Sequence, residues 1–194
     1  MINNEVTTKF PELLQLDIQD GTILDGEIIV TDQQGKPDFE AIMERFQSKK
    51  SEHAIQFCVF DVIYHNCQKV AYLPLYERKE LLDKIVDDTE LICKVRWISG
   101  NSPAYFDLVK QQGLEGIVQK KANSHYQINK RSHDWLKVIN YQYTDAFITG
   151  LRKDEFGLLL GIEENNRIKT AGIMEFVSPV ARKQFYNQYK DLIV

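Results

Sequence analysis

Apolar and polar positions alternate in two different periods along the first 140 residues, which predicts a mixture of strands and helices. Segment 22–31, TILDGEIIVT, is rich in β-branched residues and precedes the turn sequence QQGKP, a pattern typical of a strand. In DFEAIMERF, apolar side chains recur at positions 39, 42, 43 and 46. This spacing predicts one face of a helix, and Asp38 is a suitable cap.

The same pattern predicts four further strands and two further helices before residue 140. AIQFCVFDVIY from Ala54 is typical of a buried strand, and Pro74 can open a helix with apolar positions at 81, 82, 85 and 86. LICKVRW predicts a strand before a short helix with Ser102 as its cap and Gly113 as its end. Two strands follow, in EGIVQKK and DWLKVI.

After Asn140 the pattern changes to short strands with closely spaced turns. Strands are predicted in YTDAFITGL, FGLLLGIEE and RIKTAGIMEF, and a helix begins at Pro179. Successive short strands favour a small antiparallel barrel. About fifty residues are too few to close one, so we expect an incomplete barrel. A domain boundary near residue 140 follows, with residues 1–140 and 141–194 as two domains.

Composition narrows the class of protein. The chain is 43% hydrophobic, enough for a buried core, and it contains no apolar run near the ~18 residues of a membrane span. Its N-terminus, MINNEVTTKF, lacks the features of a signal peptide, so we expect a cytoplasmic protein that does not associate with a membrane. Three cysteines without CxxC spacing predict neither a disulfide framework nor a zinc site.

Positive charge is concentrated in one segment although the net charge is −4. Residues 119–137 contain one acid, Asp134, against five basic residues: Lys120, Lys121, Lys130, Arg131 and Lys137. Charge alone favours a solvated loop. The alternative is a surface that contacts nucleic-acid phosphates.

Strand periodicity also groups candidate functional side chains. Asp25 and Glu27 fall on one face of their strand. Two acids on one face indicate either a bound ligand or an edge strand with one solvent-exposed face. Glu115 and Lys137 face a common pocket if their strands pair, although a simple cross-strand ion pair fits equally. From its surroundings alone, Phe60 is a core residue.

The order of these segments carries a family resemblance. LDGEIIV, FCVFDVIY, EGIVQKK and DWLKV occur in the order and spacing of the covalent nucleotidyltransferases, and the chain closely resembles an ATP-dependent DNA ligase. RSHDWLKVINYQYTDAFITGLRKDEFG and AGIMEFVSP are most similar to the ligase domain of bacterial end-joining ligase D. The resemblance implies an α+β fold. It comprises a partial adenylation domain of antiparallel sheets flanked by helices, followed by a partial OB-fold barrel.

The resemblance also implies roles for these residues. Such ligases use ATP and Mg²⁺ to place AMP on a lysine, transfer it to the 5′-phosphate of nicked or broken double-stranded DNA, and seal the strand. Glu27 would contact the ribose and Phe60 would stack on adenine. Glu115 would support the metal, and Lys137 would neutralise the α-phosphate. The DNA contacts would come from Lys120, Lys121, Lys130 and Arg131.

Three departures from the family pattern change the expected activity. The 194 residues contain no Lys-x-Asp-Gly, which carries the nucleophile in the family. Position 139 is Ile139, where the family commonly has a second lysine, and the chain ends before the last strands of the OB-fold. We therefore expect a chain truncated at both ends that does not ligate alone.

Several alternatives stay open at this level. One is an RNA ligase or mRNA-capping guanylyltransferase, which shares the motifs. Another is a non-catalytic fragment that binds nucleotide or nicked DNA. Truncation of a sheet would also expose apolar edges, so we expect self-association or a complementing polypeptide.

Overall fold

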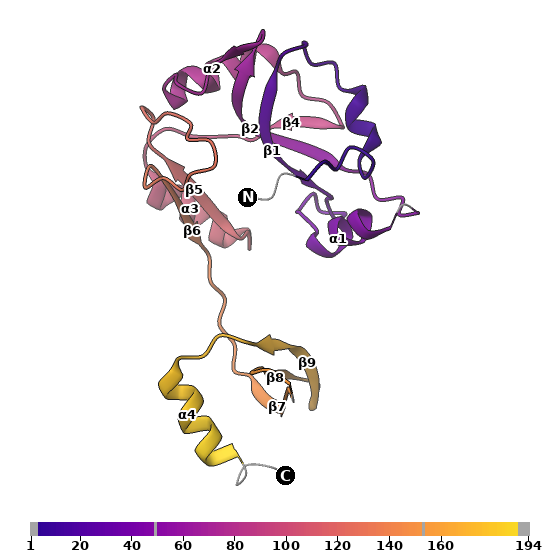
Figure 1. The fold of residues 1–194 in the computed structure, drawn as a ribbon, viewed down its shortest axis with the longest axis vertical. Coiled ribbons are helices and arrows are strands. Elements are labelled where there is room, and N and C mark those ends of the chain that lie inside the picture. Colours follow the sequence, from indigo (N-terminus) through magenta and orange to yellow (C-terminus); the bar gives the residue numbers. More distant parts are fainter. Residues whose placement is uncertain (1–3, 49, 153, 190–194) are drawn as a thin grey trace. The chain divides into compact units, whose positions relative to one another are not determined.

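The computed structural model describes residues 4–48, 50–152 and 154–189. The chain divides between Asn140 and Tyr141 into two compact units, each with its own sheets (Figure 1). In the described part of the chain, no helix has the length and apolar character needed to cross a membrane.

The main sheet of the first unit is built around one long strand, β2 (Gln56–His65). β1 (Ile23–Ile29) and the short β3 (Gln68–Lys69) pair with it antiparallel, whereas β4 (Ile92–Lys94) runs parallel to it. The register between β1 and β2 shifts at Phe60: Asp25 lies opposite Asp61, and Gly26 lies opposite Val59. Phe60 is thus the extra residue of a β-bulge, a feature that re-aims side chains.

A second, two-stranded antiparallel sheet contains β5 (Gly116–Lys120) and β6 (Trp135–Ile139). Four helices complete the first unit: η1 (Pro11–Gln15), α1 (Phe39–Gln47), α2 (Leu75–Ile85) and α3 (Ser102–Gln111). α2 packs on β2, and α3 packs beside β5.

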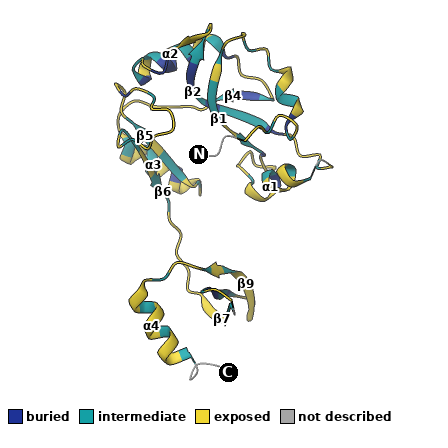
Figure 2. Ribbon diagram, in the orientation of Figure 1, coloured by how far each residue is buried: buried dark blue, intermediate teal, exposed yellow. Residues whose placement is uncertain are grey.

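The main core of the first unit lies between β2, β4 and α2 (Figure 2). Its buried members are Val59, Val62, Val70, Leu82, Val86 and Ile92. Each fully buried aliphatic side chain contributes roughly 1.5–3 kcal/mol of transfer free energy. This packing fixes β2, the strand that carries Phe60 and Asp61.

The second unit is a three-stranded antiparallel sheet and one helix. β7 (Phe147–Leu151), β8 (Leu158–Glu164) and β9 (Arg167–Met174) pair in chain order. Helix α4 (Pro179–Gln188) begins at Ser178, whose hydroxyl accepts from the Ala181 amide at 3.2 Å. Few of its side chains are buried, Leu158 among them.

The α+β class with antiparallel sheets and flanking helices is confirmed. The Asp38 cap of α1 is also confirmed, because its carboxylate accepts from the Ala41 amide at 3.0 Å. The Ser102 cap is wrong: Ser102 is the first helical residue, and the residue before it, Asn101, is left-handed with no side-chain cap bond. The predicted strand at 91–97 is shorter, and it pairs parallel to β2.

Candidate functional site

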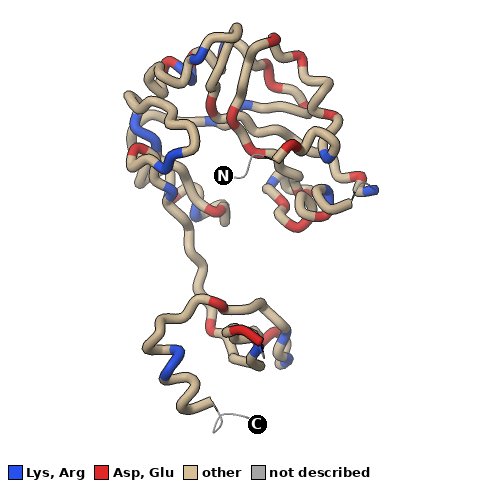
Figure 3. Tube along the Cα trace, viewed as in Figure 1, with Lys and Arg blue, Asp and Glu red and all other residues tan. Residues whose placement is uncertain are grey.

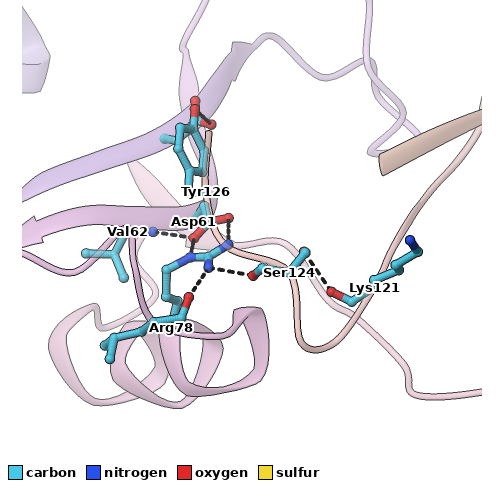
Figure 4. A network of polar contacts seen from close by, with 8 residues as sticks. Asp61, Val62, Arg78, Lys121, Ser124 and Tyr126 are labelled. Atoms are coloured by element: carbon cyan, nitrogen blue, oxygen red, sulfur yellow. Dashed lines mark hydrogen bonds and ion pairs between the residues drawn. The ribbon is translucent and has the colours of Figure 1, made fainter. Parts of the chain in front are cut away.

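A fully buried ion pair anchors the centre of the first unit (Figure 4). Asp61 and Arg78 are both 0% exposed. The guanidinium donates from Nε to Oδ1 at 2.7 Å and from a terminal nitrogen to Oδ2 at 3.0 Å. Bidentate geometry of this kind is the strong form of a charge-assisted hydrogen bond.

The same guanidinium also holds two loops. Its other terminal nitrogen donates to the carbonyls of Leu73 and, at 3.0 Å, Ser124. Asp61 in turn accepts from the Val62 amide at 2.9 Å. β2, the start of α2 and the loop after β5 are therefore fixed to one another. Sequence reasoning missed this pair. Asp61 lies in an apolar strand and was a usable signal, whereas Arg78 lies in the charged run ERKE and gave none.

Phe60, beside this pair, meets residues from the β5–β6 sheet. The Lys120 ammonium lies 4.6 Å from the centre of the Phe60 ring and 3.7 Å from the centre of the Trp135 ring. Trp135 is the register partner of Lys120, and its ring meets Tyr126 edge-on at 5.3 Å. Phe60 is half-buried, and cation–π contacts of this kind stabilise a cation on an aromatic face.

The position of Lys120 differs from the expected surface contact with DNA. Its Nζ is buried and donates no hydrogen bond within the described residues. Burial lowers the pKa of this ammonium to about 8, while nearby Asp61 acts in the opposite direction. Both oxygens of Asp61 are already bound by Arg78. A contact with DNA phosphates requires an exposed ammonium, whereas the Lys120 ammonium lies between the aromatic rings of Phe60 and Trp135.

The two acids of β1 have different surroundings. Asp25 is half-buried and accepts from the Tyr126 hydroxyl at 2.7 Å. Burial, followed by this bond to Asp25, raises the pKa of Tyr126. Glu27 is exposed opposite Cys58 and makes no hydrogen bond or ion pair with another described side chain. Its carboxylate is therefore available to a ligand.

Glu115 and Lys137 do lie together. Their Nζ–Oε1 distance is 2.6 Å, and their side chains are 74% and 56% exposed. Gly116 allows the backbones of β5 and β6 to lie close together beside this pair. Its φ is +153°, and an added Cβ would lie 2.1 Å from the Val138 carbonyl. An exposed pair contributes only about 0–1 kcal/mol, so each partner can exchange readily for a ligand.

The other three basic residues predicted to contact DNA lie on the exposed loop between β5 and β6, a loop that carries positive charge (Figure 3). Lys130 and Arg131 are exposed. Lys121 is exposed too, and its Nζ lies 2.7 Å from Asp134. Hydrogen bonds from Lys121 and Ser132 lower the pKa of that carboxyl. This surface fits the predicted contact with phosphates better than the Lys120 position does.

Over residues 4–48, 50–152 and 154–189, no three His, Cys, Asp or Glu side chains gather as a metal site. Magnesium is commonly held by one or two carboxylates together with substrate phosphates. The exposed Glu115 carboxylate is a hard oxygen donor of this type.

Comparison with known proteins places the chain among ligases. The family model described as the ATP dependent DNA ligase domain matches residues 3–138. The SPbeta prophage-derived DNA ligase-like protein LigB of Bacillus subtilis is 54% identical over 185 residues, which cover 95% of this chain and 67% of LigB. The multifunctional non-homologous end joining protein LigD of Mycolicibacterium smegmatis is 29% identical over 161 residues, or 81% of this chain and 20% of that protein.

Solved structures show the same fold. The ligase domain of Mycobacterium tuberculosis LigD matches with a TM-score of 0.62 at 24% identity, covering 95% of this chain and 61% of that domain. A mycobacterial DNA ligase D complexed with ATP and MES matches with a TM-score of 0.63 and covers 96% of this chain and 62% of that one. The chain thus spans less than two thirds of these ligase domains. Family model and relatives together show that the chain belongs to the ATP-dependent DNA ligase domain family.

Proposed function

We propose that this chain carries the adenylate-binding site of an ATP-dependent DNA ligase of the end-joining type. The observation that carries the proposal is the position of Phe60 on a β-bulge, next to the buried Asp61–Arg78 pair. A half-buried ring held rigidly in this way is a platform for a flat base. Stacking on such a ring contributes about 1–3 kcal/mol per base.

Three further side chains would complete the site. The exposed Glu27 carboxylate would accept hydrogen bonds from the ribose hydroxyls. Lys137 would leave its ion pair with Glu115 to neutralise the α-phosphate as charge builds there. Glu115 would then be free to hold Mg²⁺, which supplies charge stabilisation to the phosphate oxygens when bound.

Nicked or broken double-stranded DNA would lie against the loop between β5 and β6. Its exposed cations, Lys121, Lys130 and Arg131, would contact phosphates without reading sequence. Residues 141–194 would contribute part of an OB-fold, a barrel that commonly binds oligonucleotides.

The 194 residues contain no Lys-x-Asp-Gly. We therefore propose that a polypeptide of this sequence binds nucleotide without forming a lysine–AMP bond, and that strand joining needs a segment that supplies this lysine. LigB is named as a DNA ligase-like protein, and the LigD of M. tuberculosis has a ligase domain, which supports strand joining as the activity of the family.

Calorimetric titration of ATP and AMP, with and without Mg²⁺, tests the proposal. We expect saturable binding that Phe60→Ala weakens by roughly tenfold to a hundredfold, the equivalent of one lost stacking contact. Phe176→Ala is the matched control, because Phe176 is 94% exposed and lies in the second unit. Equal loss in both variants, or no binding, would count against the site.

Two added measurements separate the alternatives. A preference for GTP over ATP would favour a capping-type enzyme. Intact-protein mass spectrometry after incubation with ATP and Mg²⁺ should show no AMP adduct, and an adduct would overturn the proposed absence of the nucleophile.

A further inference from the structure

Two cysteines from neighbouring strands of the main sheet face each other. Cys58 in β2 and Cys93 in β4 are register partners in the parallel pair. Their Sγ atoms lie 3.5 Å apart. Both are half-buried, whereas the third cysteine, Cys67, is exposed in the turn before β3. The proposed nucleotide site uses none of the three thiols.

The backbone around this pair suits a covalent bond. Neighbouring strands stand about 4.8 Å apart, and a disulfide spans Cα atoms about 4.4–6.8 Å apart. Val59 and Ile92, next to the pair, are 0% and 3% exposed and fix the two strands in the core. Closing the sulfurs from 3.5 Å to bonding distance therefore needs side-chain rotation, without movement of the strands.

We propose that Cys58 and Cys93 are a site of reversible oxidation, where a peroxide converts the thiol pair into a disulfide between β2 and β4. The thiolate of Cys93 attacks one peroxide oxygen, which gives a sulfenic acid and releases water after protonation. The sulfur of Cys58 then attacks the sulfenic sulfur and loses its proton. The S–S bond forms and a second water leaves, so two thiols lose two electrons and hydrogen peroxide becomes two waters.

The order of these steps follows from the surroundings of Cys58. Burial raises its pKa to about 12, and the hydrogen bond with Cys93 and the charge of Glu27 act in the same direction. Cys58 therefore stays a thiol near neutral pH and reacts second, within the pair. Cys67 is exposed and has no second thiol beside it, so its oxidation gives a sulfenic acid or a higher oxidation state instead of a disulfide within the chain.

One consequence rests on the proposed function. Cys58 lies opposite Glu27 across β1 and β2, and Glu27 is the proposed ribose contact. Turning the Cys58 sulfur toward β4 changes the packing beside that carboxylate. We expect a change in AMP affinity on oxidation, but formation of the disulfide is measured independently of any nucleotide.

Peptide mapping of the full chain tests the oxidation site. The native protein is treated with hydrogen peroxide, unfolded, alkylated without reductant and digested. We expect one cross-linked species that joins the Cys58 and Cys93 peptides and disappears on treatment with dithiothreitol. Cys67→Ser should retain this species, and Cys93→Ser should lose it.

Circular dichroism of Cys93→Ser, with Cys93→Ala as a second replacement, checks that loss of the cross-link does not reflect loss of the fold. Oxidised protein should also show a higher thermal midpoint than reduced protein, because the bond closes a loop over the 35-residue separation of the two cysteines. Recovery of Cys58 and Cys93 as separately alkylated peptides from oxidised native protein would overturn the proposal. Cross-links through Cys67 would overturn it equally.

Discussion

Replacing Arg78 with methionine isolates the contribution of the buried ion pair to the fold. The change keeps most of the apolar length of the side chain but removes every donor. It leaves the Asp61 carboxylate at 0% exposure with the Val62 amide as its hydrogen-bond donor among the described contacts. It also removes the donor to the carbonyls of Leu73 and Ser124.

The magnitude follows from this geometry. Breaking a buried pair by removing one partner costs about 3–5 kcal/mol, because the remaining charge stays buried. A typical domain has about 5–15 kcal/mol of stability, so Arg78→Met should remove a large part of it. Arg45→Met is the matched control: Arg45 pairs with Glu12, and their side chains are 11% and 28% exposed. The control should lose less, about 1–3 kcal/mol, because the Glu12 carboxylate keeps contact with water when its partner is removed.

Urea unfolding followed by tryptophan fluorescence measures both variants. Both tryptophans, Trp97 and Trp135, lie in the first unit, so the signal reports on the unit that contains the pair. A second test combines Asp61→Leu with Arg78→Met, which should recover much of the lost stability because no uncompensated charge is left. The reasoning is refuted if Arg78→Met costs no more than Arg45→Met.

Three other predictions follow from single contacts. Lys120 has a folded pKa of about 8 and an ordinary value of 10.5, so the unfolded state binds more protons between these values. The unfolding free energy of the native chain relative to Lys120→Met should therefore rise from about pH 8 to 10.5, and a flat difference would contradict the buried ammonium. Gly116→Ala should lower the free energy of unfolding in urea by about 1–3 kcal/mol, because an added Cβ would lie 2.1 Å from the Val138 carbonyl at a φ of +153°. Gly35→Ala is the control for backbone strain alone, because an added Cβ there meets nothing within 4 Å at a φ of +77°. Lys130→Ala with Arg131→Ala should weaken binding of nicked DNA and lower the slope of log affinity against log salt by about two, as measured by fluorescence anisotropy, whereas an unchanged slope would exclude this loop as a phosphate contact.

Local features of the fold were predictable from the sequence because their causes are local. The Asp38 cap and the apolar side of α2, with Leu82 and Val86 each 1% exposed, follow from spacing alone. Helix α1 is a partial exception: Phe39 belongs to its apolar set but is 76% exposed. Periodicity identifies an apolar face, but what covers that face depends on tertiary packing.

Features that depend on distant residues were not predictable. The parallel pairing of β4 with β2 is set by the path of α2, and the β-bulge at Phe60 has no signal in a single strand. The inward turn of Lys120 likewise depends on Trp135, its partner across the sheet. The pairing of Glu115 with Lys137 was anticipated as one of two alternatives, and the two side chains form a direct ion pair.

A crystal structure of the chain with AMP and Mg²⁺ tests the central claim most directly. The account predicts the adenine ring stacked on Phe60, the ribose hydroxyls at Glu27, and the phosphate within hydrogen-bond distance of Lys137, with the Glu115–Lys137 ion pair opened. AMP bound at another surface, or bound with Phe60 and Lys137 both uncontacted, would contradict it.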